Sequence, residues 1–120
     1  MSDSLVSPGT PLGLVLVTID TEAHAQTLAQ QLVEARLAAC VSLGPVQSVY
    51  RWQGRIHQDN EWQLTIKTDL SCFDDLAQFI TQHHPYDLPE IIALPLAAGT
   101  TAYLTWLGAQ IRPAESGDRE

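Results

Sequence analysis

The 120-residue sequence predicts one α+β domain with a ferredoxin-like split β-α-β-β-α-β arrangement, an antiparallel sheet and an additional C-terminal helix. Three observations predict this fold class. Hydrophobic residues make up 45% of the chain, enough for one core but not for two. The periodicity of the apolar residues alternates between strand and helix in the required order. Among the predicted strands, only the two that this topology places at the sheet edges contain a proline.

The first strand and the first helix follow from a change of periodicity near Asp20. The segment LGLVLVTI, residues 12–19, is apolar on both faces and has strand length, which is typical of a strand inside a sheet. We expect Asp20 or Thr21 to cap the helix that follows, and Arg36 to lie in its last turn, where a cation is favourable. The apolar residues of this helix recur at helical spacing: Ala25, Leu28, Ala29, Leu32 and Ala35.

A long β-hairpin is predicted between residues 38 and 68. This segment is rich in β-branched and aromatic residues, and it turns at a Gln-Gly step ending in Gly54, where positive φ costs little. Apolar and polar residues alternate over residues 61–67, so one face of the second arm is apolar. In the first arm, the neighbouring Gly44 and Pro45 predict a break or a bulge.

The second half of the chain predicts a helix, a strand and a closing helix. Ser71 with Asp74 three residues later forms a capping box, and helical spacing of apolar residues continues to His83. Two prolines in HHPYDLPE then require an extended or turning path. A strand over residues 91–94 and an amphipathic helix over residues 103–111 complete the domain.

The order of elements predicts the arrangement of the sheet. Right-handed crossovers place the first and third strands in the centre and the second and fourth strands at the edges. Proline supports this order independently, because Pro45 in the second strand and Pro95 in the fourth both require an edge or a strand end.

Composition and charge exclude several classes of protein. The net charge is −8 and the six basic residues form no run, so no nucleic-acid partner is expected. No apolar run approaches the roughly 20 residues of a membrane-spanning helix, and no secretory signal is recognisable. Cys40 and Cys72 lack CxxC spacing, so we expect reduced thiols and a cytoplasmic protein. We expect flexible tails over residues 1–12 and 112–120, around a single domain over residues 13–111.

Self-association is predicted because two helices cover only one face of a four-stranded sheet. The first and fourth strands carry apolar residues on both faces. An exposed apolar face and long hairpin edges favour aggregation in a monomer, so we expect copies of the chain to bury both. The alternative is that the third helix folds across this face by itself.

His83 and His84 are the most conspicuous candidate metal ligands. Neighbouring residues share no face of a helix or strand, so both reach one ion only where the chain kinks, and Pro85 supplies a kink. Imidazole suits copper or zinc, and Cys40 or Glu90 would complete a site if the fold or a neighbouring subunit brings it near. The alternative is a helix C-terminus whose dipole favours partly charged imidazoles.

The hairpin carries a second candidate site. Lys67, the only lysine, shares a strand face with Glu61, which predicts either an interface ion pair or a cleft for a small anionic or zwitterionic ligand. Tyr50 and Trp52 would wall such a cleft, or else pack as ordinary hairpin aromatics.

Two further patterns are less specific. One strand carries acidic and imidazole side chains at alternate positions: His57, Asp59 and Glu61. These side chains either coordinate a divalent cation together or form a solvent-exposed face of the strand. Cys40 and His84 would pair as thiolate and imidazolium only if the fold joined them, and no motif supplies an oxyanion hole. With no GxGxxG and no Walker loop either, the sequence does not predict an enzyme.

Several segments, in unbroken order, resemble the CutA divalent-cation tolerance proteins. They are AACVS, VYRWQG, the IKT segment that follows Glu61, HHPYDLPEI with LPL, and AYLTWL, and the resemblance spans Gly13 to Ile111. It implies a ferredoxin-like subunit, a homotrimer and a link to tolerance of copper and other divalent metals. These implications agree with the fold and the self-association predicted from the residues.

The resemblance also assigns residues. The copper ligands of bacterial members of the family correspond to His83 and His84, and the cysteine that some members carry at the end of the first strand is replaced by Val17. Without that soft ligand, an imidazole site suits Cu(II) or Zn(II) better than Cu(I). With Cys40 from another family motif added, the possible cleft at the subunit boundaries comprises Cys40, Trp52, Glu61, Lys67, Tyr86 and Glu90.

Two functions are therefore predicted. The first is a homotrimeric cytosolic protein that binds copper or another divalent metal through His83 and His84, without catalytic turnover. The second is a small-molecule sensor like the PII signalling trimers, which share this topology and bind ligands between subunits. The PII proteins use a long loop between the second and third strands, so the short turn at Gly54 counts against nucleotide signalling of that kind.

Overall fold

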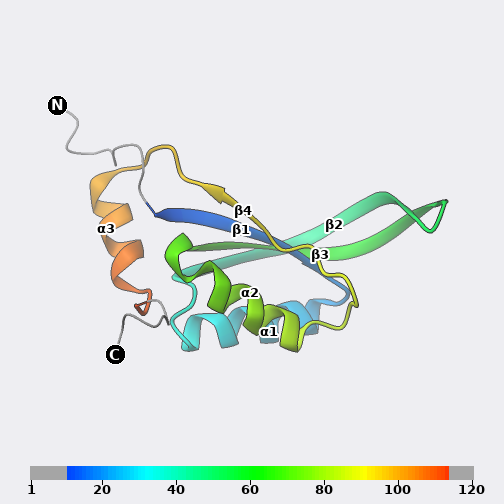
Figure 1. Ribbon diagram of the computed structural model, residues 1–120, viewed down its shortest axis with the longest axis horizontal. Coiled ribbons are helices and arrows are strands. Elements are labelled where there is room, and N and C mark those ends of the chain that lie inside the picture. The colour runs from blue at the N-terminus through cyan, green and yellow to red at the C-terminus, as the bar shows by residue number, and fades with distance from the viewer. Residues whose placement is uncertain (1–10, 114–120) are drawn as a thin grey trace.

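The structure is a computed structural model that describes residues 11–113, and it contains one four-stranded antiparallel sheet with two helices on one face (Figure 1). The strand order β2-β3-β1-β4 places β1 and β3 in the centre, which confirms the predicted α+β ferredoxin-like topology. A 3₁₀ turn at Leu70–Cys72 precedes the second helix. The elements are β1 (Leu12–Ile19), α1 (Glu22–Glu34), β2 (Cys40–Trp52), β3 (Arg55–Asp69), α2 (Phe73–His83), β4 (Ile92–Pro95) and α3 (Thr101–Ala109).

The main core lies between the sheet and the two helices. Strand periodicity turns alternate residues of β1 and β3 towards α1 and α2, and these residues are almost completely buried. The principal core residues are Val15, Val17, Ile19, Leu28, Leu32, Leu64, Ile66, Leu76 and Ile80.

The helix α1 begins as predicted but ends differently. Thr21 is its N-cap, and the threonine hydroxyl accepts a hydrogen bond from the backbone N–H of His24 at 3.1 Å. Arg36 was predicted in the last turn, and this is wrong, because the helix ends at Glu34 and Arg36 has φ 60°. Its guanidinium instead donates a hydrogen bond to the carbonyl of Ala109, which ties the end of α1 to α3.

The predicted capping box of Ser71 and Asp74 is also wrong. The carboxylate of Asp69 accepts hydrogen bonds from both the backbone N–H and the hydroxyl of Ser71, at 2.9 and 2.7 Å. The first turn after β3 is therefore a 3₁₀ turn that Asp69 caps, and α2 starts one residue later than the box required.

The β2–β3 hairpin is long and uninterrupted. Its register runs from the pair of Cys40 and Lys67 to the turn without a skipped residue, so the bulge predicted at Pro45 is absent. A proline is tolerated there because β2 is an edge strand, as predicted. Gln53 and Gly54 both have positive φ, which gives a two-residue turn that matches the twist of the strands.

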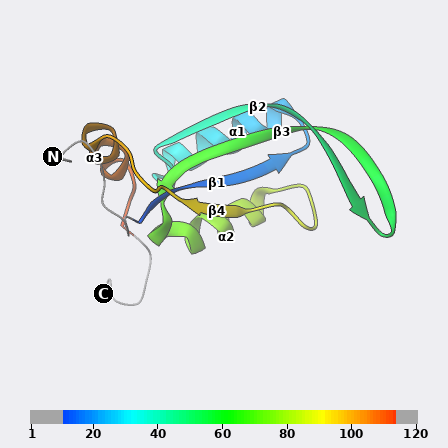
Figure 2. The same ribbon diagram turned by 90° about the horizontal axis from the view of Figure 1, so that it is seen from above.

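The opposite face of the sheet, called the outer face below, stays open in the described part of the chain. The helix α3 packs at one end of the sheet through Leu104 and Leu107 on Leu12, and it does not cross this face (Figure 2). The alternative prediction, that the third helix covers it, is therefore wrong. Ile92 and Leu94 on β4 are 51% and 44% exposed.

The predicted tails overlap the folded part of the chain. Leu12 is the buried first residue of β1, and Arg112 donates its backbone N–H to the carbonyl of Arg36 at 2.9 Å. Residues 1–10 and 114–120, which make up the rest of both predicted tails, lie outside the described residues.

Candidate functional site

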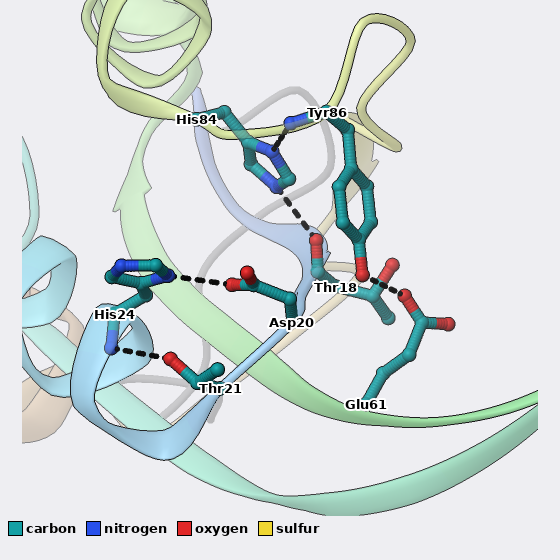
Figure 3. A network of polar contacts seen from close by, with 7 residues as sticks. All are labelled: Thr18, Asp20, Thr21, His24, Glu61, His84 and Tyr86. Carbon is teal, nitrogen blue, oxygen red and sulfur yellow. Dashed lines mark hydrogen bonds and ion pairs between the residues drawn. The ribbon is translucent and has the colours of Figure 1, made fainter.

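His84 lies at the end of α2, where the chain changes direction. The residue that precedes a proline is disfavoured in helical conformation, and His84, which precedes Pro85, is extended with φ −94° and ψ 138°. Its side chain reaches back to β1, where Nε2 donates to the carbonyl of Thr18 at 2.7 Å, and Nδ1 accepts the backbone N–H of Tyr86 at 3.1 Å (Figure 3). Both ring nitrogens of a neutral imidazole are therefore engaged within the chain.

His83 presents a different arrangement. It is exposed, its ring stacks on Phe79 with 4.1 Å between ring centroids, and its Nδ1 donates to the carbonyl of Phe79 at 2.8 Å. Within residues 11–113, its Nε2 makes no hydrogen bond. A carbonyl that holds one ring nitrogen fixes the tautomer and leaves the other nitrogen as a lone-pair donor, which is the common arrangement of metal-binding histidines.

His83 and His84 border a small pocket between α1 and the end of α2. The pocket has a volume of about 300 Å³. A third histidine, His24 in the first turn of α1, lines the same pocket and is not among the predicted metal ligands. The remaining lining residues are Thr27, Leu28, Gln31, Gln82 and Pro85.

His24 is held by Asp20, four residues earlier. Its Nδ1 donates to Oδ1 of Asp20 at 2.7 Å, and Figure 3 shows the other ring nitrogen pointing away from this carboxylate. Partial burial acts to raise the pKa of Asp20, but the hydrogen bond and the charge of His24, with backbone hydrogen bonds, outweigh it and lower the pKa. The four-residue spacing of Asp20 and His24 at a helix start was the sequence signal for this pair.

A larger cleft lies where the hairpin meets the loop after α2. Its volume is about 730 Å³. Four of the six residues predicted for a cleft line it: Trp52, Glu61, Tyr86 and Glu90. Tyr50, which was predicted with Trp52 to wall a cleft, lines it too. Residues that the prediction did not assign to this cleft complete it: Thr18, Ser48, Val49, Asp59, Asp87 and Leu88. Its titratable side chains are carboxylic acids and tyrosines, so the cleft is acidic rather than suited to an anion.

Two hydrogen bonds order the walls of this cleft. The hydroxyl of Tyr86 donates to Oε1 of Glu61 at 2.8 Å, and Glu61 is only 8% exposed (Figure 3). Burial, followed by the hydrogen bond to Glu61, raises the pKa of Tyr86 well above its usual 10.0. Along the hairpin, the hydroxyl of Tyr50 donates to Asp59, which raises the pKa of Tyr50.

The other two predicted cleft residues lie elsewhere on the outer face. Cys40 and Lys67 are paired neighbours on β2 and β3, and neither lines the cleft in a single chain. Nζ of Lys67 donates to the hydroxyl of Tyr103 at 3.2 Å, and this hydrogen bond raises the pKa of Lys67. A direct pairing of Lys67 with Glu61 within one chain does not occur among the described ion pairs.

Val17, which replaces the family cysteine, lies in the core. It is fully buried on the face of β1 that turns towards α1 and α2, whereas His83 is exposed. Among residues 11–113, no three His, Cys, Asp or Glu side chains gather closely enough to hold a metal ion.

The fold and the two sites define a ferredoxin-like protein with imidazoles at a helix end and an acidic aromatic cleft. The family model described as CutA1 divalent ion tolerance protein matches residues 13–110. The chain belongs to this CutA divalent-cation tolerance family.

Individual relatives support the same assignment. The chain is 46% identical over 100 residues to the divalent-cation tolerance protein CutA of Pectobacterium atrosepticum, covering 82% of this chain and 91% of that protein. It is 47% identical over 95 residues to the CutA of Thermus thermophilus, covering 78% and 92%. The solved structure of CutA from Synechococcus elongatus aligns with a TM-score of 0.85 at 46% identity, covering 91% of this chain and 96% of that one.

The helices of the described segment are short. None of those within residues 11–113 has both the length and the apolar character needed to cross a membrane.

Proposed function

We propose that this chain forms a cytosolic homotrimer that binds copper or another divalent metal and supports tolerance of metal ions without catalytic turnover. Membership of the divalent-cation tolerance family supports the metal as the partner. The metal contact is assigned to His83, with His84 beside it, and the boundary between copies is assigned to the outer face of the sheet.

The accessible Nε2 of His83 is the observation that carries this proposal. Phe79 holds the ring on one side, so the side chain is already ordered before a metal binds. His84 would bind the same ion only after Nδ1 released the backbone N–H of Tyr86 or Nε2 released Thr18. We therefore assign His83 the direct contact, and His84 a direct contact only where one of these bonds opens. Imidazole ligands without a thiolate favour Cu(II) or Zn(II).

The exposed outer face supports the homotrimer. Leu14 pairs with Leu94, and Leu16 pairs with Ile92, so four apolar side chains form a contiguous patch across β1 and β4. β4 is an edge strand, so it has a neighbouring strand on one side only. A contiguous apolar surface beside an edge strand is a common form of interface between subunits.

Calorimetric titration with Cu(II) tests the metal site. We expect His83→Gln to weaken the Kd by about 10–100-fold, as loss of a metal-site group does, and His84→Gln to weaken it less. His57→Gln is the matched control, because His57 lies on the hairpin and borders neither pocket. The site would be refuted if His83→Gln, His84→Gln and the double variant all bound Cu(II) as tightly as the parent chain does.

A second candidate function rests on the larger cleft. Its volume of about 730 Å³ and its aromatic and acidic walls are typical of a site for a small organic ligand, as the sensor hypothesis requires. The two-residue turn at Gln53 and Gly54 counts against nucleotide signalling of the PII kind. A thermal-shift screen of metabolites tests this candidate: a stabilising hit that Glu61→Gln abolishes would support it, and the absence of any such hit would remove it.

A further inference from the structure

We propose that His24 and His83 together form a two-imidazole metal site in the pocket between α1 and the end of α2, with Asp20 as the residue that positions His24. This inference rests on the proposed metal-binding function and names a second protein ligand for the metal at His83. The sequence pattern pairs His83 with its neighbour His84, whereas the structure favours a partner 59 positions away on another helix.

The three histidines differ in which of their ring nitrogens make hydrogen bonds within the chain. In His24 and in His83 the Nδ1–H is donated to a fixed oxygen, the Asp20 carboxylate at 2.7 Å and the Phe79 carbonyl at 2.8 Å. In the neutral form of each ring, Nε2 therefore carries a lone pair, and neither Nε2 makes a hydrogen bond within the described residues. A carboxylate or a carbonyl behind the imidazole is the usual second contact of a metal-bound histidine. His84 lacks a comparable lone pair because both of its nitrogens are already bonded.

The position of the two rings makes a shared ion feasible. Both line the same pocket of about 300 Å³, and α1 and α2 lie side by side on one face of the sheet (Figure 1). His24 is 56% exposed at its side chain, so an ion can approach its ring without disturbing the core. Gln31 and Gln82 line the pocket as well, and their amide oxygens, with water, complete the coordination.

The chemistry of this donor set selects the metal. Two neutral imidazoles with amide and water oxygens suit Cu(II), Zn(II) or Ni(II), and the absence of a thiolate disfavours Cu(I).

Titration of the full chain with Cu(II) and with Zn(II) tests the proposal, with the variants His24→Gln, His83→Gln and His57→Gln. We expect His24→Gln and His83→Gln each to weaken binding by about 10–100-fold, and His57→Gln to change it by less than about twofold. Electron paramagnetic resonance of the Cu(II) complex should show two coordinated imidazole nitrogens in the parent chain and one in His24→Gln. Because His24 is exposed, circular dichroism should show that His24→Gln keeps the parent fold.

The outcomes separate this inference from the proposed function. If His83→Gln weakens binding while His24→Gln and the spectrum stay as in the parent chain, the two-imidazole site is wrong and metal binding at His83 stands. If neither variant changes the affinity, both are wrong. A loss of one nitrogen signal in His24→Gln, together with weaker binding, establishes the pair.

Discussion

The hydroxyl of Tyr86 donates a hydrogen bond of 2.8 Å to the carboxylate of Glu61, a residue 25 positions earlier in the chain. This contact joins the loop after α2 to the middle of β3, and it forms one wall of the larger cleft. Glu61 is nearly buried and makes no ion pair within the described residues, so the tyrosine is its main compensation for lost solvation. The loop and the hairpin are therefore coupled through one side-chain pair.

Removing the Tyr86 hydroxyl should destabilise the fold. We expect Tyr86→Phe to lower the free energy of unfolding by about 1–3 kcal/mol, because it leaves a buried carboxylate without its donor. Tyr103→Phe is the matched control: Tyr103 is exposed and its hydroxyl accepts from Lys67 at the surface, so the expected loss is below about 0.5 kcal/mol. Urea denaturation measures both, and equal losses would contradict the role of Tyr86.

The raised pKa of Tyr86 predicts a loss of stability at alkaline pH. Below pH 10.0, the usual pKa of a tyrosine, Tyr86 keeps its proton in both the folded and the unfolded chain, so its hydrogen bond contributes fully to the stability. As the pH rises above 10.0 towards the higher folded value, only the unfolded chain ionises, and stability is lost. We expect the stability difference between the parent chain and Tyr86→Phe to shrink above pH 10, measured by denaturation at a series of pH values. A difference that stays constant to pH 11.5 would show that burial does not shift this group.

The outer face predicts the assembly state. Leu94→Glu places a charge in the apolar patch and should convert the proposed trimer into monomers, because a carboxylate is costly to bury at a subunit boundary. Val33→Glu makes the same change at an exposed position on α1 and should leave the trimer intact. Light scattering after size exclusion measures both masses. A monomeric parent chain, or a trimeric Leu94→Glu variant, would contradict the assignment of this face.

Gly13 is required by the close packing of β1 against β4. A Cβ at this position would lie 2.6 Å from the carbonyl oxygen of Leu94 and 2.6 Å from the side chain of Leu70. We expect Gly13→Ala to destabilise the chain by about 1–3 kcal/mol. Gly44→Ala, in open space on β2, should instead be neutral or stabilise it by less than about 1 kcal/mol. Thermal unfolding compares the two, and similar melting temperatures would contradict the crowding at Gly13.

The start of α2 offers a test of capping. Asp69→Ala removes the acceptor of two hydrogen bonds from Ser71 and should lower the free energy of unfolding by about 1 kcal/mol. Asp74→Ala should lower the free energy of unfolding less, because the backbone N–H of Ser71 in the 3₁₀ turn bonds to Asp69. Urea denaturation distinguishes the two positions. A larger loss of unfolding free energy for Asp74→Ala than for Asp69→Ala would instead support the capping box.

The order and sheet positions of the elements were predictable because they depend on local periodicity. The bounds of β1, the turn at Gly54 and the end of α2 at His83 all follow from residues within a few positions of each other. Errors arose where two local signals competed. Asp69 and Asp74 were both available to cap α2, and only the geometry after β3 decided between them. Pro45 predicted a bulge, but an edge strand accommodates its missing N–H.

The candidate sites were predictable only in part. Four of the six cleft residues converge because the predicted topology brings the hairpin and the loop after α2 to one region. Cys40 and Lys67 share a strand face with them, yet they lie further along the sheet, where twist and distance separate them from the cleft. His24 was missed because its partner on the pocket, His83, is remote in sequence.

By itself, the sequence determined the fold class, the central and edge strands, the apolar outer face and the set of imidazoles available to a metal. Only the tertiary structure decided which ring nitrogens are free. Both ring nitrogens of His84 are hydrogen-bonded, to Thr18 and Tyr86, whereas His24 and His83 each use only one ring nitrogen in a hydrogen bond. The physical reason is that periodicity is a property of neighbouring residues, whereas a hydrogen bond between distant residues depends on strand register and loop path, which no local pattern specifies.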